Sequence, residues 1–261
     1  GQKDSASNLR RLLEGSGYTT KQGEKRMQDS YSLRCIPQIH GASRLAVDYV
    51  SSVIENELNA VTDNPVVFIE TGEVFSGGNF HGEPVAIAAD TLGIAVSELA
   101  NISERRIAKL IDPSQNHGLS AFLVKNGGIN CGFMIPQYAA AALVSENKIL
   151  AHPASVDSIP TSAGQEDHVS MGTIGARKAA AIVENVTTVL GIELMSAAQA
   201  IDLQGKKKMG KGTSEAYKLV RSQIDFMEND RIFYKDQKLA ADLIHGGTLV
   251  ASVEKVIGEI N

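Results

Sequence analysis

The sequence predicts an all-α protein, built as a bundle of long helices. Three observations support this: aromatic residues make up only 5% of the 261 residues, Trp is absent, and long segments place Ala, Leu, Ile and Val three and four positions apart. With 43% hydrophobic residues, the chain can bury a substantial core. We therefore expect a single helical region over 1–261, and not a disordered or fibrous protein.

The first 25 residues are expected to lead into this core. A short helix is predicted from Asn8 to Leu13, followed by a polar loop from Gly15 to Glu24. The core is expected over 26–202, and its first helix is predicted from Ala42 to Leu58.

Two long helices are predicted in the middle of the chain. The first starts near Glu83-Pro84 and ends around Asp112-Pro113, because Pro is tolerated in a first turn and stops a helix further on. The second is bounded downstream by Gly205, and Ala covers much of its surface. Such a surface admits close neighbours on several sides, so we expect other subunits to complete the bundle. The two apolar stripes are Val85, Ala88, Leu92, Ala95, Leu99 and Ile102, and Ile182, Val186, Val189 and Ile192.

Shorter helices are predicted on both sides of the second long helix, at Met134 to Leu150, Glu215 to Asp225 and Ser252 to Ile260. The last two form the C-terminal part, 203–261. Between them and the core, Gly205 to Gly212 is a Lys-rich segment that we interpret as a solvated loop, because it lacks the glycine and lysine spacing of a phosphate-binding loop.

Composition and spacing exclude several classes of function. The net charge of -5 disfavours nucleic acid and anionic membranes as partners, and we found no apolar run of the roughly 20 residues that span a bilayer. Cys35 and Cys131 lie far apart, which favours reduced thiols and a cytoplasmic location. The six histidines show no His-x-x-x-His spacing, so no metal is expected, and no Gly-x-Ser-x-Gly element of a serine hydrolase occurs.

Three polar stretches stand out from the helical pattern: a first stretch, 28–34 (QDSYSLR), a second, 77–84 (GGNFHGEP), and a third, 161–168 (TSAGQEDH). In the first, Gln28, Tyr31 and Arg34 are spaced by three, so an amide, a phenol and a guanidinium can lean toward one side. That side could hold an amino acid, with the guanidinium on its carboxylate. Alternatively, Arg34 caps a helix or forms a surface ion pair.

The second and third stretches each leave two interpretations open. Paired glycines before Phe80 could press the ring against a ligand, or they could make a turn with Phe80 as a core anchor. The carboxylates of the third stretch precede a helical stripe, so Asp167 and His168 could simply cap that helix.

Taken together and in this order, the three stretches resemble the C-terminal half of the aromatic amino acid ammonia-lyases, and most closely the histidine ammonia-lyases. The match runs from about Arg26 to about Asp202 and includes Glu104-Arg105-Arg106, interpreted as ion pairing, and Asn126 to Gly132, interpreted as a packed turn. The resemblance implies an aspartase-like helical fold and a homotetramer. It also implies a methylidene-imidazolone group made from an Ala-Ser-Gly tripeptide, which is absent here, so the chain alone is expected to be inactive.

The resemblance also implies the reaction and the site. In the complete enzyme L-histidine would lose ammonia to give urocanate, with Arg34 on the substrate carboxylate and Tyr31 as an acid/base group. Gln28 and Phe80 would shape the pocket, and Glu166 would act as a base or hold the imidazole or amine. In the same run, Gln165 would bind substrate. Some relatives have Pro in place of Ser30, which would stiffen the turn.

Two other functions remain open at this point. A phenylalanine or tyrosine lyase, or an aminomutase, would fit most of the motifs, although Glu166 favours a substrate side chain that can donate N–H bonds. A non-catalytic helical scaffold could keep the same motifs for packing alone.

Overall fold

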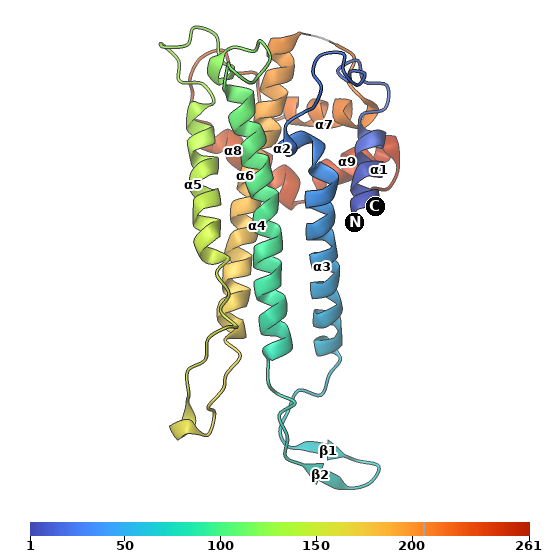
Figure 1. Cartoon of the computed structure of the whole chain (residues 1–261), viewed down its shortest axis with the longest axis vertical. Coiled ribbons are helices and arrows are strands. Elements are labelled where there is room, and N and C mark those ends of the chain that lie inside the picture. Colours follow the sequence, from blue (N-terminus) through green and yellow to red (C-terminus); the bar gives the residue numbers. More distant parts are fainter. Residues whose placement is uncertain (206) are drawn as a thin grey trace.

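The computed structural model describes residues 1–205 and 207–261 and is mostly helical (Figure 1). Four long helices run along the long axis of the molecule, joined at alternate ends, and the C-terminal helices pack beside their upper half. The α-helices are α1 Gln2–Leu12, α2 Tyr31–Arg34, α3 Ile36–Leu58, α4 Glu83–Ile111, α5 Met134–Leu150, α6 Gly172–Gln204, α7 Lys211–Arg221, α8 Phe233–His245 and α9 Thr248–Ile257. The predicted all-α bundle is confirmed.

Helices α4 and α6 form the centre of the bundle. Their stripes bury Ile107, Ile182 and Ile192 completely in one apolar cluster, together with Ala140 of α5. Both ends agree with the sequence signals, since α4 has Pro84 in its first turn and α6 stops at Gly205, whose φ of 86° suits glycine. This pair sets the distance between the two ends of the molecule.

The same two helices are long and apolar enough, by length and composition alone, to cross a membrane. The sequence-based statement that no segment reaches this length is therefore wrong. In the fold both helices carry buried polar groups: Glu104 of α4 is 1% exposed and accepts a 2.7 Å hydrogen bond from Gln137 of α5. Core helices of a bundle pass the same test of length and composition.

Several shorter helices differ from their predicted bounds. Helices α1 and α3 begin earlier than predicted, and α7 and α9 are shifted toward the N-terminus. Helix α8 was not predicted, and neither was the antiparallel pair of β1 (Val66–Phe68) and β2 (Glu73–Phe75), which projects from the lower end (Figure 1). The pair has the usual hairpin signals, β-branched and aromatic residues around Thr71-Gly72.

The predicted basic loop is only partly a loop. Helix α7 already starts at Lys211, and Gly210 precedes it, so the loop prediction is wrong for Lys211 and Gly212; Lys206 lies outside the described residues. A side chain on Gly210 would collide with the Leu12 carbonyl oxygen. These glycines therefore allow α7 to approach α1 closely. From the sequence alone, glycines that allow close packing cannot be distinguished from glycines that make a loop flexible.

The lower half of α6 is not surrounded in this chain. Toward its C-terminus, Ala198 and Ala200 are buried, whereas Ile174 and Val183 nearer the start are 42% and 39% exposed. Ile87 and Ile94, seven positions apart on one face of α4, are exposed as well. Apolar surface of this kind is typical of a helix that another subunit covers.

Candidate functional site

The first stretch lies at the upper end of the bundle, where α2 joins α3 (Figure 1). Its three side chains converge as predicted: the Arg34 Nη2 donates to Gln28 Oε1 at 3.0 Å, and the guanidinium carbon lies 4.3 Å from the centre of the Tyr31 ring. The Arg34 Nε also donates to the Asp29 carbonyl oxygen at 2.9 Å. A guanidinium has five N–H donors, more than these two bonds use. Arg34 is exposed and oriented, and it could bind a carboxylate.

Helix α2 is held in place by an ion pair inside the bundle. Arg106 of α4 donates from Nη2 to Glu193 of α6 at 2.7 Å, and from Nη1 to the Ser32 carbonyl oxygen at 3.4 Å. Ser103 donates to the same carboxylate at 2.6 Å. The predicted ion pairing by Arg106 is confirmed, and its partner is an adjacent helix of the same chain. It links the substrate-binding candidates to the centre of the fold.

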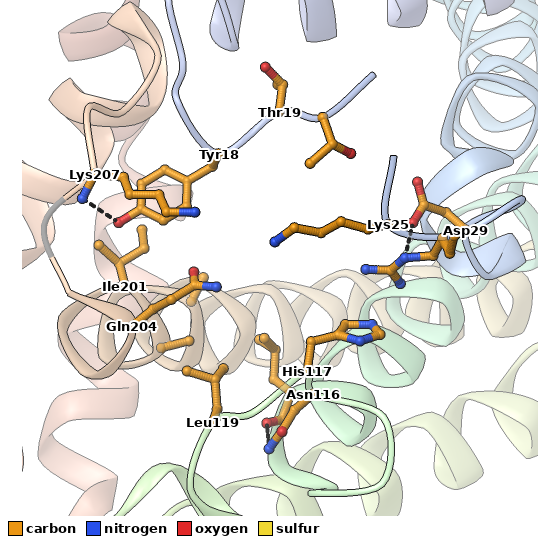
Figure 2. Close-up of a pocket in the computed structure, with 15 residues that line it drawn as sticks. Tyr18, Thr19, Lys25, Asp29, Asn116, His117, Leu119, Ile201, Gln204 and Lys207 are labelled. Carbon is orange, nitrogen blue, oxygen red and sulfur yellow. Dashed lines mark hydrogen bonds and ion pairs between the residues drawn. The ribbon is translucent and has the colours of Figure 1, made fainter. Parts of the chain in front are cut away.

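A cavity of about 950 Å³ lies next to α2, between the 18–29 loop, the 116–119 turn and the last turns of α6 (Figure 2). Among the described residues, the cations Lys25, Arg26 and Lys207 line it, and Arg26 pairs with Asp29 at 3.4 Å. Burial, followed by the charge of Arg26, lowers the pKa of His117 in the same cavity. The upper end is therefore a cationic region.

The second and third stretches meet at the lower end of the bundle. They line one pocket of about 360 Å³, to which they contribute Phe80, Gln165 and Glu166, among others. Phe80 is 54% exposed, so it is not a core anchor within this chain. The two stretches come together because α4 and α6 pack against each other and start at the same end. The fold thus joins residues that are far apart in the sequence.

Glu166 is held in a tight loop. Its backbone pairs with Thr161 in an isolated antiparallel bridge, and its Oε2 accepts a 2.5 Å hydrogen bond from the Thr161 hydroxyl. This bond, with one from Ser162, lowers the pKa of Glu166. At neutral pH Glu166 is therefore an exposed carboxylate, suited to accept hydrogen bonds from an N–H group.

The capping interpretation of the third stretch is not supported. The residue that precedes α6 is Met171, in a left-handed conformation with a φ of 58°, and no side chain of the described residues caps this helix terminus. Asp167 and His168 lie before that point, and His168 faces a different helix. Its carbonyl oxygen is 3.2 Å from His81 Nε2.

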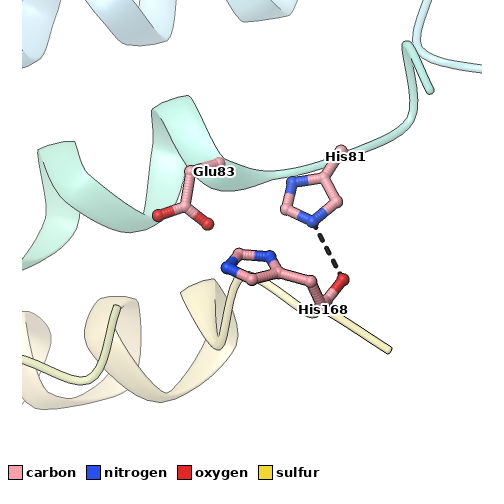
Figure 3. A group of neighbouring side chains, drawn as sticks. All are labelled: His81, Glu83 and His168. Carbon is pink, nitrogen blue, oxygen red and sulfur yellow. Dashed lines mark hydrogen bonds between the residues drawn. The ribbon is translucent and has the colours of Figure 1, made fainter. Parts of the chain in front are cut away.

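A group of three side chains next to the pocket was missed by the sequence analysis. His81 just before α4, Glu83 at the start of α4 and His168 near the end of the loop before α6 point toward one another (Figure 3). The two imidazole rings lie 5.5 Å apart. No local spacing could have revealed them, because His168 comes from a separate element. The loop before it is held by Asp90, whose carboxylate accepts the backbone N–H groups of Ala154 and Ser155.

The candidate residues therefore form two groups at opposite ends of one chain. Arg106, which contacts α2, lies 23 positions beyond Glu83 (106 minus 83) on the same helix. At 1.5 Å per residue this is about 35 Å, far longer than any amino acid. The structure brings Gln28, Tyr31 and Arg34 together, and separately Phe80, Gln165 and Glu166. It does not bring the two groups to one place.

Comparisons with known proteins match this arrangement of helices and motifs. The family model for aromatic amino acid lyases matches residues 1–222. Histidine ammonia-lyase 2 of Fusobacterium nucleatum is 66% identical over 259 residues, which are 99% of this chain and 51% of that protein. Histidine ammonia-lyase of Alkaliphilus oremlandii is 58% identical and covers 98% of this chain and 50% of its own length. The chain spans about half the length of the curated relatives it matches, their C-terminal half.

Solved structures of the same family share this fold. The crystal structure of histidine ammonia-lyase from Trypanosoma cruzi superimposes with a TM-score of 0.89 at 48% identity and covers 98% of this chain and 48% of its own. Tyrosine aminomutase from Streptomyces globisporus reaches a TM-score of 0.93 at 34% identity, over 100% of this chain and 53% of its own. The fold is therefore shared by lyases and aminomutases.

Proposed function

From the premise that this chain belongs to the aromatic amino acid lyase family, we propose that it is the C-terminal half of a histidine ammonia-lyase, which converts L-histidine to urocanate and ammonia. The observation that carries the proposal is the pocket in which Phe80 and the Glu166 carboxylate face the same space. An aromatic ring and an N–H acceptor suit an imidazole side chain, which is flat and donates N–H bonds.

The chain's own residues take the roles that their geometry allows. Arg34, stacked on Tyr31 and exposed, binds the substrate carboxylate through two parallel hydrogen bonds. Tyr31, beside it and 67% exposed, exchanges a proton near the reacting carbon. Glu166 has a lowered pKa, which favours holding the imidazole or amine over abstracting a proton. Gln28 orients Arg34, and Gln165 adds a hydrogen-bonding group to the pocket.

Family membership implies a methylidene-imidazolone group, which would supply an electrophile for the elimination. It forms from an Ala-Ser-Gly tripeptide that this sequence lacks, so we propose that another segment of the complete enzyme supplies it. The residues fit such a partner, since Tyr31 and Arg34 of α2 and Phe80 and Glu166 of the loops before α4 and α6 are all exposed and not in the core. They are free to face a group from outside this chain.

We also propose that a homotetramer assembles the site; the separation of about 35 Å between the two groups of one chain supports a site shared between subunits. Residues at the upper end of one subunit would meet residues at the lower end of another. The exposed apolar positions of α4 and α6, including Ile94 and Val183, would be covered in that assembly.

A tyrosine or phenylalanine aminomutase or lyase is the second candidate, favoured by the TM-score of 0.93 with tyrosine aminomutase. The test joins this chain to a half that bears Ala-Ser-Gly and compares turnover of histidine, tyrosine and phenylalanine. We expect urocanate absorbance to rise with histidine and little turnover of the other two. Preferred turnover of tyrosine or phenylalanine, or no turnover by a folded complex, would contradict the proposal. The chain alone is expected to be catalytically inactive and serves as the control.

A further inference from the structure

A second possible ligand site lies beside the substrate pocket and consists of His81, Glu83 and His168. Each offers one ligand atom, and these three atoms lie within 4.8 Å of one another (Figure 3). We propose that they bind a divalent transition-metal ion, with Zn²⁺ as the best fit. Two imidazoles and one carboxylate are a ligand set that zinc uses in proteins, with a fourth position left for water.

The hydrogen bond at His81 prepares that side chain for a metal. Its Nε2 lies 3.2 Å from the His168 carbonyl oxygen. A carbonyl oxygen can only accept, so Nε2 carries the proton, and the lone pair of the neutral ring is on Nδ1. Metal-binding histidines commonly donate their other N–H to a backbone carbonyl in this way, which fixes the tautomer and the ring orientation.

Glu83 supplies a second, independent observation. Its Oε2 is buried and has no hydrogen-bond partner among the described residues. A buried carboxylate oxygen without a partner is costly, and a cation would satisfy it. Figure 3 shows the carboxylate directed toward the two imidazole rings.

The surrounding charge favours a cation. Among the described residues that line the adjacent pocket, Glu166 and Asp167 are acidic, and neither Lys nor Arg is present. Zn–N and Zn–O bonds of about 2.0–2.1 Å place tetrahedral ligands about 3.3 Å apart, so the three atoms need to approach one another by at most about 1.5 Å. His168 is exposed, and rotation of its side chain can supply this movement.

This proposal departs from the expectation that the chain binds no metal, which rested on spacing along the sequence. Spacing detects only ligands on one element, whereas these belong to the start of α4 and to the loop before α6. The proposal concerns binding alone and does not depend on the reaction or its substrate.

The test is a titration of the intact protein that contains this chain with Zn²⁺ by calorimetry, in the absence of histidine, which chelates metals itself. Co²⁺ absorption then reports the coordination geometry. We expect one ion per chain. His168→Gln and Glu83→Gln should each weaken binding at least about 100-fold, beyond the 10- to 100-fold typical when an outer-sphere partner is lost. His245→Gln, which changes an exposed histidine at the end of α8, is the matched control and should bind normally.

Two results would overturn the proposal. One is the absence of stoichiometric binding by the unchanged protein. The other is binding that persists in both His168→Gln and Glu83→Gln, which would place the ion elsewhere. Circular dichroism of each variant separates lost binding from lost folding, and the exposed position of His168 makes that variant the safer of the two.

Discussion

At the upper end of the bundle an exposed guanidinium stacks on a phenol beside a cationic cavity, whereas at the lower end a carboxylate and two imidazoles face a small pocket. The upper end is suited to a carboxylate and the lower end to N–H groups, and an amino acid such as histidine carries both. Because about 35 Å separates the ends, one chain offers two half-sites. The two groups of one chain are therefore too far apart to hold the same substrate molecule, which is why we propose that subunits share the site.

The largest expected effect is a loss of stability when Asp90, which holds the loop before α6 at the lower end, is replaced. Burial raises the pKa of Asp90. This effect is outweighed by hydrogen bonds from the backbone N–H groups of Ser155 and Ala154 and from the Ser155 hydroxyl, and by the charge of Lys178, so the pKa is lowered overall. Asp90→Ala would leave two backbone N–H groups without an acceptor and should cost about 2–4 kcal/mol of stability, while Asp90→Asn should cost less. Chemical denaturation measures this. A loss below about 0.5 kcal/mol in Asp90→Ala would show that the loop is held by other contacts.

The second prediction tests the upper half-site in the complete enzyme. Arg34→Lys keeps the charge but loses the planar fork, and a hydrogen bond to a charged group contributes roughly 1.5–3 kcal/mol. Catalytic efficiency should fall about 10- to 150-fold. Arg10→Lys, at an exposed position of α1, is the control and should have little effect. Unchanged kcat/KM in Arg34→Lys would remove Arg34 from substrate binding.

The third prediction tests the lower half-site. Glu166→Gln preserves size and removes the charge, and Glu166→Ala also empties the space, so both should damage histidine turnover by a similar 10- to 150-fold, Ala more. Steady-state kinetics and thermal unfolding of the same variants provide the measurement. Normal kinetics with stability lowered by about 0.5–2 kcal/mol would assign Glu166 to local structure and weaken the case for histidine as substrate. Glu228→Gln changes an exposed carboxylate elsewhere and serves as control.

The smallest expected effect is a pH dependence inside the bundle. Burial, then the charge of Arg106, lowers the pKa of His40 below the usual value for histidine, so the folded protein favours the neutral ring. The unfolded chain takes up a proton below about pH 6.5, so stability is complete above that pH and falls as the pH drops toward the folded pKa. Unfolding at pH 7 and pH 5 should show this loss. In His40→Gln the stability should differ less between pH 7 and pH 5 than in the unmodified protein. An identical difference in both proteins would show that His40 does not cause the pH dependence.

The sequence predicted the upper half-site better than the lower one. Gln28, Tyr31 and Arg34 lie within one turn-like segment, so spacing alone predicted that they converge. Phe80, His81 and His168 meet only because α4 and α6 pack together, and no local pattern reports such a contact. For Phe80 and Glu166 the signal was a family resemblance, and for the three possible metal ligands there was none.

The same distinction between local patterns and tertiary contacts explains which helices were predicted correctly. Proline, glycine and an apolar stripe predicted both ends of α4, and the end of α6, almost to the residue. Glycines at 210 and 212 were misread as a loop because they serve close packing on α1, which depends on the tertiary structure. Helix α8 and the β1–β2 pair carry readable local patterns, so local sequence could have predicted them and no tertiary effect explains their absence from the prediction.

The most direct test of the central claim mixes two inactive variants of the complete enzyme, Arg34→Ala and Glu166→Ala, so that they assemble together. If each site takes Arg34 from one subunit and Glu166 from another, random mixing leaves both residues intact in about a quarter of the sites of a symmetric oligomer. We therefore expect histidine turnover to recover to about that fraction of the unmodified enzyme. Mixed oligomers that form, as shown by mass spectrometry, yet stay inactive would contradict the account and place both residues in the site from the same chain.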